Sequence, residues 1–321
     1  MRIVVALGGN ALLERGEAPD ADIQEHHVEG AAKSLAPLVQ KHDVVITHGN
    51  GPQVGVLALE SGADLALSRP YPFDSLVAET QGLIGSWLLA AVEHAAPGHE
   101  AVCLLTRTLV DAADPAFSTP TKFVGRLYTV RQARDLSRRH GWAMRQDGAS
   151  WRRVVASPEP TAIIELEEIR TLLNDGWTVI CAGGGGVPVA RDDAGELRGV
   201  DAVVDKDLTT ALLAIHLQAD AFLLLTDVAN VQREYGTPGA CAIGKTTVAA
   251  MREMDFAAGS MGPKVEGACR FVEATGGLAA IGKLADAVRL LGAEAGTIVY
   301  PNKAPAGAPI ASANQSKEVT P

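Results

Sequence analysis

Three lysines of this chain stand where they could support phosphoryl-transfer chemistry. Lys206 lies between two aspartates in VVDKDL, Lys264 follows GSMGP, and Lys122 stands in TPTKFVG. A single lysine is most often a solvated surface charge. Phosphoryl transfer, however, needs cations that hold the transferring group and neutralise the charge on its oxygens. A carboxylate such as Asp207 can hold such lysines in place, although DKD is also an ordinary helix-capping string.

Three glycine-rich strings predict places where the backbone approaches a ligand closely. Their residues are Gly8, Gly9 and Asn10 in ALGGNA, Gly49, Asn50 and Gly51 in HGNGPQVG, and Gly183–Gly186 in AGGGGVPV. Glycine leaves backbone N–H groups accessible, and N–H groups at a helix start favour anions. A tight turn after an edge strand explains the first string equally well. Four glycines after a buried strand are costly in entropy, so together the strings favour a large anionic ligand.

A fourth string, GACAIGKTT at Gly239–Thr247, spells the phosphate-binding P-loop pattern G-x-x-x-x-G-K-T. That motif requires a buried strand directly before its first glycine and a helix that begins at the lysine. Here the preceding residues QREYGTP are polar and contain Pro238, which excludes a central strand. We therefore expect a loop that leads into a short helix, and no phosphate-binding role for Lys245. A P-loop ATPase or GTPase is the alternative that this interpretation rejects.

No histidine of the chain is a convincing general base. His48 lies in the second glycine-rich string, but a structural hydrogen bond explains it at least as well. A kinase whose acceptor is already ionised needs no base, so the absence of one does not exclude phosphoryl transfer.

Short apolar strings alternate with longer helical stretches, which predicts an α/β fold. The expected strands are RIVVAL, DVVIT, AVCLLT, WTVICA, AFLLLT, GLAAI and TIVY, and helical patterns cover about 21–41 and extend to about His94. Such alternation gives crossover connections and a mostly parallel sheet with helices on both faces, a three-layer α/β/α sandwich. Ligands of these sheets bind at the carboxyl ends of strands, where the three glycine-rich strings begin.

Two segments depart from this alternation. Residues 114–160 lose the pattern and contain a charged helix, so we expect a small inserted subdomain or lid there. Residues 301–321 contain four prolines, many alanines and no aromatic residue, which predicts a disordered tail.

The bulk composition excludes several classes of protein. The net charge is −10 and no basic cluster stands out, so nucleic-acid binding is disfavoured. The four cysteines and eight histidines show no metal-binding spacing. No apolar run is long enough for a signal peptide or a membrane span, and we expect a soluble cytoplasmic protein.

Ten strings occur in the order typical of one family. They are ALGGNALL, HGNGPQVG, TQGLIGSWL, PTKFVG, WRRVVASPEP, CAGGGGVPV, GVDAVVDKD, LLLTDV, GSMGPKVEGA and GTIV. Together they resemble the carbamate kinase family, within the wider amino-acid-kinase fold, from about residue 1 to 300. The glycine loops are shared with acetylglutamate, aspartate and uridylate kinases, whereas the PTK insertion, SPEP and GSMxPK narrow the resemblance to carbamate kinases.

The resemblance implies a homodimer whose subunit has two lobes joined by one sheet. Residues 1–113 and 161–220 would form an acceptor-binding lobe, 114–160 a mobile subdomain, and 221–300 a nucleotide-binding lobe. The implied enzyme is a phosphotransferase with a carboxyl-type acceptor, which converts ATP and carbamate reversibly to ADP and carbamoyl phosphate. It would often run toward ATP in arginine catabolism. Mg²⁺ would accompany the nucleotide, held mainly by phosphate oxygens and water.

The resemblance also implies roles for individual residues. The implied catalytic residues are Lys122, Lys206, Asp207 and Lys264. Phosphate and acceptor contacts are implied for Gly8, Gly9, Asn10, Gly49, Asn50 and Gly51. Nucleotide contacts are implied for Gly184, Gly185, Asp227, Tyr235 and Met261.

One departure from the family pattern concerns the loop that carries Lys122. The family usually reads PTKPxGP there, whereas Phe123 and Arg126 replace the two prolines in this chain. A freer loop and an added charge leave open a kinase of the same fold that acts on another small acid, such as an acyl or phosphonate acceptor. A non-catalytic nucleotide-binding regulator is disfavoured, because such a protein would be free to lose the three lysines and the aspartate.

Overall fold

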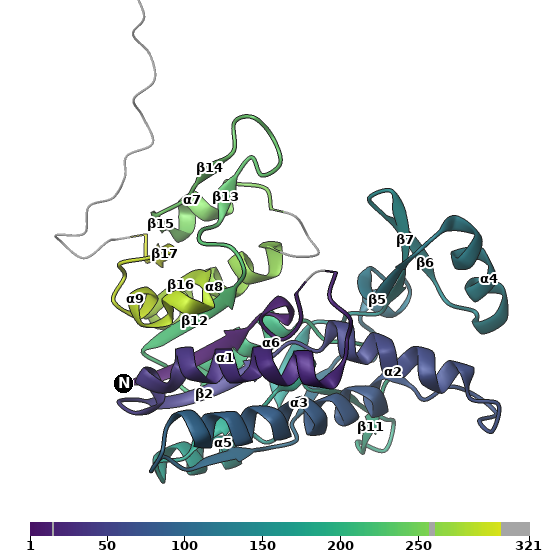
Figure 1. Cartoon of the computed structure of the whole chain (residues 1–321), viewed down its shortest axis with the longest axis horizontal. Helices are drawn as coiled ribbons and strands as arrows, with labels where there is room; N and C mark the ends of the chain where they lie inside the picture. Colours follow the sequence, from purple (N-terminus) through teal and green to yellow (C-terminus); the bar gives the residue numbers. More distant parts are fainter. Residues whose placement is uncertain (15, 257–260, 303–321) are drawn as a thin grey trace, which may run out of the picture.

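The computed structural model describes residues 1–14, 16–256 and 261–302 and shows a three-layer α/β/α arrangement (Figure 1). The described part of the chain therefore has the predicted fold class. The segment 301–321, predicted to be a disordered tail, falls almost entirely outside the described residues.

The middle layer is an eight-stranded sheet in the order β15-β17-β16-β12-β1-β2-β9-β3. The strands are β1 Arg2–Leu7, β2 Asp43–His48, β3 Ala101–Cys103, β9 Thr178–Ile180, β12 Ala221–Thr226, β15 Lys245–Thr247, β16 Leu278–Lys283 and β17 Thr297–Tyr300. All neighbours in it pair in parallel except β16 and β17. All seven strands expected from the apolar strings are present, because β-branched and leucine-rich runs fit a sheet buried on both faces.

Side chains of the central strands alternate between two cores. In β1, Val4 and Ala6 belong to one core, whereas Ile3, Val5 and Leu7 belong to the other. The first core is closed by α5 Leu166–Asn174, α6 Lys206–His216 and α8 Met261–Thr275, and the second by α1 Ala21–Val39, α3 Phe73–Ala95 and α9 Ala287–Leu291. The period of two along each strand thus positions helices on both sides of the sheet.

Three smaller sheets accompany the central one, and the smallest is the antiparallel pair of β13 Gln232–Arg233 and β14 Cys241–Ala242. A four-stranded sheet contains β4 Arg107–Val110, β8 Pro160–Ile163, β10 Val187–Arg191 and β11 Leu197–Gly199. A three-stranded sheet contains β5 Lys122–Tyr128, β6 Met144–Asp147 and β7 Ser150–Val155. With α4 Val130–His140, this last sheet forms the projecting unit at the right of Figure 1, which we call the subdomain.

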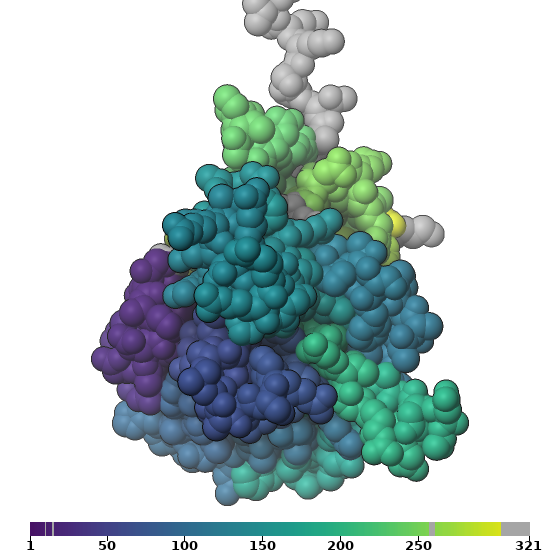
Figure 2. Space-filling view, turned by 90° about the vertical axis from the view of Figure 1, so that its right-hand side faces the viewer, coloured from purple at the N-terminus to yellow at the C-terminus, as the bar shows by residue number. Residues whose placement is uncertain are grey.

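The subdomain rests on the helix that follows the second glycine-rich string. This helix, α2 Gly51–Ala63, contacts β5, and Figure 2 shows the teal subdomain lying over the dark blue α2 region. Gly55 of α2 meets Gly125 of β5 so closely that a Cβ atom on Gly55 would lie 2.2 Å from the Gly125 Cα. The sequence gives no direct sign of this pairing of two glycines, because they are 70 positions apart.

By length and composition, α3 is the one helix among the described residues that could cross a membrane. Its apolar residues, however, include Leu76, Ile84 and Leu88, which are buried in the fold, and the helix packs against α1 and α2. Buried core helices pass the same test of length and composition, so α3 is explained by its place in the helical layer.

We predict that Gly55→Ala destabilises the protein or displaces the subdomain. The added methyl group would overlap the backbone of Gly125, and overpacking of this kind costs about 1–3 kcal/mol. Urea unfolding of Gly82→Ala supplies the control, because Gly82 lies on the exposed side of α3 with nothing within 4 Å of an added Cβ. That control gains about 0.5–1 kcal/mol. Equal stability of Gly55→Ala and wild type would contradict the predicted contact.

Candidate functional site

The first two glycine-rich strings meet at the carboxyl edge of the central sheet. Leu7 and His48 are paired in register, so Gly8 and Gly49 leave adjacent strands side by side. A Cβ on Gly49 would lie 3.0 Å from the Gly9 nitrogen, which shows how closely the two loops pack. The backbone N–H of Gly8 donates to Leu225 O at 2.9 Å, and that of Gly49 to Leu7 O at 3.0 Å. These two N–H groups are used within the sheet, so the two glycines serve close packing.

The N–H groups that remain for a ligand belong to the residues after these two glycines. Gly9 begins the short 3-10 helix η1 Gly9–Ala11, and Asn50 and Gly51 begin α2. The backbone N–H groups of Gly9, Asn50 and Gly51 have no acceptor among the described residues. The side chain of Asn10 is not described. The edge therefore has free donors at a helix N-terminus, the feature that favours an anion.

The third glycine-rich string lies behind this edge. Ala182 has φ 49°, and Gly184, Gly185 and Gly186 have φ values of 66°, 94° and 83°. A Cβ on Gly184 would lie 2.2 Å from Asn50 Nδ2, and one on Gly185 would lie 2.6 Å from Val204 O. The left-handed turn therefore requires glycine both for its backbone angles and for its packing against Asn50 and the start of α6. A nucleotide contact of Gly184 and Gly185 stays a prediction.

The start of α6 is capped by Asp205, a residue to which the sequence reasoning assigned no role. Its Oδ1 accepts hydrogen bonds from the backbone N–H of Asp207 at 2.9 Å and of Leu208 at 3.4 Å. This is the ordinary N-cap arrangement, and it makes Lys206 the first residue of the helix, as predicted. The string DKD, which is typical of a helix cap, could have predicted the capping role of Asp205 from the sequence.

Lys206, Asp207 and Lys264 form a buried charge cluster. Lys206 Nζ lies 2.7 Å from Asp207 Oδ1, and Lys264 Nζ lies 3.0 Å from Asp207 Oδ2. Lys206 and Asp207 are 8% and 5% exposed. Helices α6 and α8 approach each other at Gly267, where a Cβ would lie 3.0 Å from Asp207 O, and this approach places Lys264 against Asp207. Two of the predicted lysines and the aspartate are thus brought together from positions 57 residues apart.

Electrostatics within the cluster favour an ionised Asp207. Burial would raise the pKa of Asp207, but Lys206 and Lys264 outweigh it and hold that pKa far below its usual value. For Lys264, burial lowers the pKa, but the attraction of Asp207, helped by Asp205 and Asp227, outweighs it and leaves the pKa raised. Burial lowers the pKa of Lys206. The negative charge of Asp207 raises this pKa, whereas the positive charge of Lys264 lowers it further. One carboxylate between two ammonium groups leaves a cationic site.

Lys206 retains unused hydrogen-bonding capacity. Its Nζ lies within ion-pair distance of Asp207 Oδ1, but the angles are unsuitable for a hydrogen bond, so neither atom has a hydrogen-bond partner among the described residues. Buried polar groups normally have such partners, and an ammonium group has three donors. An anion with several acceptor oxygens, such as a phosphoryl group, would satisfy them.

Lys122 reaches the same region from the subdomain. Its Nζ lies 2.6 Å from Asp205 Oδ2, while the other oxygen of Asp205 caps α6. Asp205 thus connects the first residue of β5 to the helix that begins with Lys206. The structure places Lys122 next to the charge cluster through this shared carboxylate.

His48 lies beneath the cluster and is fully buried. Burial, with a smaller contribution from Lys206, lowers its pKa to about 4, against a hydrogen bond between Nδ1 and Gly49 O at 3.0 Å. The ring is therefore neutral at pH 7. The structural interpretation of His48 fits this geometry better than a role as general base.

The residues predicted to contact nucleotide lie in three places. Asp227 follows β12 and accepts a hydrogen bond from Thr226 Oγ1 at 3.0 Å. Met261 begins α8 and packs against the first core. Tyr235 lies between the short strands β13 Gln232–Arg233 and β14 Cys241–Ala242 and is 76% exposed. Asp227 is close enough to the cluster to attract Lys264 electrostatically, whereas no contact joins Tyr235 to it in the described part of the chain.

The P-loop-like string has the wrong geometry for phosphate binding. Lys245 begins strand β15, which pairs with β17, and the next helix, α7 Val248–Arg252, starts three residues later. The predicted loop was wrong where Cys241–Ala242 and Lys245–Thr247 form strands, whereas the predicted short helix does follow, at Val248–Arg252. The rejection of a P-loop is confirmed, since no helix begins at Lys245.

The two residues that replace the family prolines make contacts within the subdomain. Arg126 stacks over the Tyr128 ring, with 5.3 Å from its Cζ to the ring centroid. Phe123 lies under the guanidinium of Arg152 at 5.6 Å. Their influence on the acceptor stays a prediction.

We predict a pH dependence of stability from His48. Its folded pKa of about 4 lies below the ordinary 6.5, so the unfolded chain takes up a proton first as the pH falls. Its contribution is complete above pH 6.5 and declines as the pH falls toward 4, by about 2 kcal/mol between pH 7 and 5. Urea unfolding over this range should show a flatter curve for His48→Gln. His94→Gln, at an exposed site, should keep the wild-type slope, and identical curves for His48→Gln and wild type would refute the assignment.

Comparisons with known proteins identify the family to which this chain belongs. The model of the amino acid kinase family matches residues 1–281. A carbamate kinase of Rhizobium meliloti (strain 1021) is 50% identical over 302 residues, covering 93% of each chain. A carbamate kinase of Haemophilus influenzae is 46% identical, covering 92% of this chain and 96% of the relative.

Solved structures agree with the sequence relatives. The carbamate kinase of Giardia lamblia bound to citric acid has a TM-score of 0.88 at 39% identity and covers 94% of this chain and 98% of its own. The same Giardia enzyme bound to AMP-PNP has a TM-score of 0.84 at 40% identity, with the same coverage. This chain therefore belongs to the amino acid kinase family and, within it, to the carbamate kinases.

Proposed function

We propose that this chain transfers a phosphoryl group reversibly between ATP and carbamate, with ADP and carbamoyl phosphate on the other side. The observation that carries this function is the buried cluster of two lysines on one carboxylate, beside free backbone donors at the sheet edge. Membership of the carbamate kinases supports the acceptor. The Giardia lamblia relative bound to AMP-PNP supports a site for ATP.

Lys206 and Lys264 would neutralise the charge that spreads over the transferring phosphoryl group. Asp207 holds both ammonium groups in place, so little reorganisation is needed when that charge develops. Gly9 would add its backbone N–H to the phosphoryl oxygens, while Gly8 permits the close packing of the loop. Lys122, supplied by the subdomain, would bring a third cation once it leaves Asp205.

The acceptor would lie at the start of α2. Asn50 and Gly51 present free backbone N–H groups there, and the Asn50 side chain is fixed by a hydrogen bond from Nδ2 to Thr80 Oγ1 at 2.8 Å. A carbamate oxygen attacks the γ-phosphorus while the bond from that phosphorus to the bridging oxygen of ADP breaks. Carbamate is already an anion, so no proton leaves the acceptor and the neutral His48 is not required as a base.

We assign the two sides of this reaction to different parts of the chain. Residues 1–113 and 161–220 would hold the acceptor, 221–300 the nucleotide, and 114–160 the mobile subdomain. The position of Asp227 directly after β12 and of Met261 at the start of α8 supports this assignment for the nucleotide.

The metal requirement follows from the available ligands. Among the described residues no group of three or more His, Cys, Asp or Glu side chains could hold a metal ion, and Asp205 and Asp207 are both paired with lysines. Mg²⁺ would be bound mainly through ATP phosphates and water, beside the exposed carboxylate of Asp227, which attracts Lys264 electrostatically. The ion would shield phosphate charge. A cytoplasmic homodimer that makes ATP in arginine catabolism completes the proposal, supported by the family resemblance.

We predict that Lys206→Ala lowers kcat about 100-fold to 1,000-fold, as for the loss of one preorganised charge-stabilising group. The measurement is ATP formation from ADP and carbamoyl phosphate with Mg²⁺, and thermal unfolding checks that the variant is folded. Lys245→Ala serves as the matched control, because it replaces the lysine of the P-loop-like string and should retain activity. A folded Lys206→Ala enzyme with wild-type turnover would overturn the mechanism.

The two functions of Asp205 can be separated by two substitutions. Asp205→Asn keeps an N-cap for α6 and should leave stability nearly unchanged, whereas Asp205→Ala should cost about 1 kcal/mol. Both changes remove the carboxylate that pairs with Lys122, so both should alter turnover. Urea unfolding and the same ATP assay measure the two effects. Wild-type kinetics in Asp205→Asn would show that the pair with Lys122 has no part in catalysis.

A further inference from the structure

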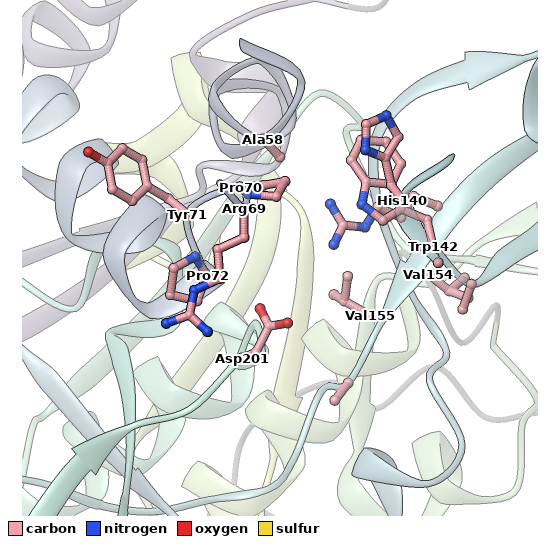
Figure 3. Close-up of a pocket in the computed structure, with 14 residues that line it drawn as sticks. Ala58, Arg69, Pro70, Tyr71, Pro72, His140, Trp142, Val154, Val155 and Asp201 are labelled. Atoms are coloured by element: carbon pink, nitrogen blue, oxygen red, sulfur yellow. The ribbon is translucent and has the colours of Figure 1, made fainter. Parts of the chain in front are cut away.

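A cavity lies between the subdomain and the rest of the protein, and the residues of the charge cluster do not line it. Its volume is about 520 Å³. Figure 3 shows one wall made by Ala58, Arg69, Pro70, Tyr71 and Pro72, the opposite wall made by His140, Trp142, Val154 and Val155, and Asp201 between them. Neither Lys206 nor Lys264 lines it. The proposed transfer reaction makes no use of this space.

Arg153, which also lines the cavity, is held between two aromatic rings. Its Cζ lies 4.1 Å from the ring centroid of Trp142 in the subdomain and 4.6 Å from that of Phe73 at the start of α3. These two cation–π contacts restrict the orientation of the guanidinium. Burial lowers its pKa to about 10, although Asp201 and Tyr128 act against this, so Arg153 is still charged at pH 7.

The N–H groups of Arg153 are available to a ligand. No hydrogen bond or ion pair to this side chain occurs within the described residues, and none of its nitrogens is among the buried atoms that lack a partner, so they remain accessible from the cavity. A guanidinium with a restricted orientation and free edges matches the two oxygens of a carboxylate. Arg69, on the opposite wall, adds a second positive charge.

Asp201 supplies a negative charge in the same cavity. Its Oδ1 accepts the backbone N–H of Phe73 at 2.9 Å, which holds the carboxylate in place, and no hydrogen bond to Oδ2 occurs among the described residues. Asp201 attracts Arg153 electrostatically, yet the two do not form an ion pair. A gap therefore separates a fixed cation from a fixed anion, and apolar surface from Trp142, Pro70 and Val155 adjoins it.

We propose that this cavity binds the zwitterion of a small apolar α-amino acid, with its carboxylate on Arg153 and its ammonium group on Asp201. The apolar side chain would lie against Trp142 and the prolines of the opposite wall. A phosphate ion would satisfy the arginines but would leave Asp201 facing a second negative charge. The zwitterion satisfies both ends at once.

Such a ligand would also act on the proposed reaction, because it touches both the subdomain and the protein body. Val155 lines the cavity and pairs with Lys122 across β5 and β7. Lys122 in turn reaches Asp205. An amino acid in the cavity would hold the subdomain in place and so set the position of Lys122, which makes the cavity an effector site.

Isothermal titration calorimetry with L-leucine tests the binding, with 4-methylpentanoate as the matched compound that lacks the ammonium group and inorganic phosphate as a third probe. Leucine should bind in the millimolar range and 4-methylpentanoate more weakly. Arg153→Gln and Asp201→Asn should each weaken leucine binding about tenfold or more, as expected for a lost charge-assisted hydrogen bond. Arg69→Gln, at an exposed position whose replacement leaves the fold intact, should also weaken it.

Two controls locate the site. Arg145→Gln changes another exposed arginine of the subdomain, and Lys206→Ala changes the charge cluster; both should bind leucine as wild type does. Absence of leucine binding, loss of binding only in Lys206→Ala, or equal binding of leucine, 4-methylpentanoate and phosphate would each overturn the proposal. The kinetic effect rests on the proposed function: leucine should change the KM for carbamoyl phosphate in wild type but not in Asp201→Asn. The calorimetry does not depend on enzyme activity.

Discussion

The burial of Asp207 between two lysines is the constraint on which the rest of this structure depends. Charges taken out of water lose hydration, and only close partners can compensate for it. Lys206 reaches Asp207 because the two residues are neighbours in the first turn of α6. Lys264 reaches it only because α8 lies directly against α6, and the absence of a side chain at Gly267 permits this close packing. Loss of one partner from such a group typically costs about 3–5 kcal/mol, so the packing of α6 and α8 and the charge cluster stabilise each other.

The sheet edge completes this arrangement from the other side. Adjacent parallel strands release Gly8 and Gly49 at the same level, and the absence of side chains there allows the two loops to touch. The left-handed turn at Gly184 packs directly against the Asn50 side chain. The proposed reaction would use the backbone donors of this edge together with the two ammonium groups of the cluster. Electrostatic stabilisation of a phosphoryl group needs this kind of preorganisation more than it needs any single residue.

Asp205 shows how the subdomain is joined to this site. One of its oxygens caps α6 and the other pairs with Lys122, so the start of the helix and the position of the subdomain share a single carboxylate. The cavity around Arg153 and Asp201 lies at the second junction between the same two parts. The pairing of β5 with β7 links these junctions, because Lys122 lies opposite Val155, and this is the route by which the proposed ligand would act on Lys122.

Hydrophobic periodicity, capping and glycine content are local properties, so they were enough to predict seven strands of the central sheet, the alternation with helices and the residue types of the site. Local patterns of this kind predicted the start of α6 at Lys206, the strand AFLLLT and the glycine loops. The sequence did not show that Lys264 meets Asp207, that Asp205 pairs with Lys122, or that Arg153 stacks between Phe73 and Trp142. The sequence also did not predict strand β15 at Lys245, because this strand forms by pairing with β17, which lies far along the chain. Each of these contacts joins residues far apart in the chain and depends on how the helices and sheets pack, so local sequence patterns could not predict it.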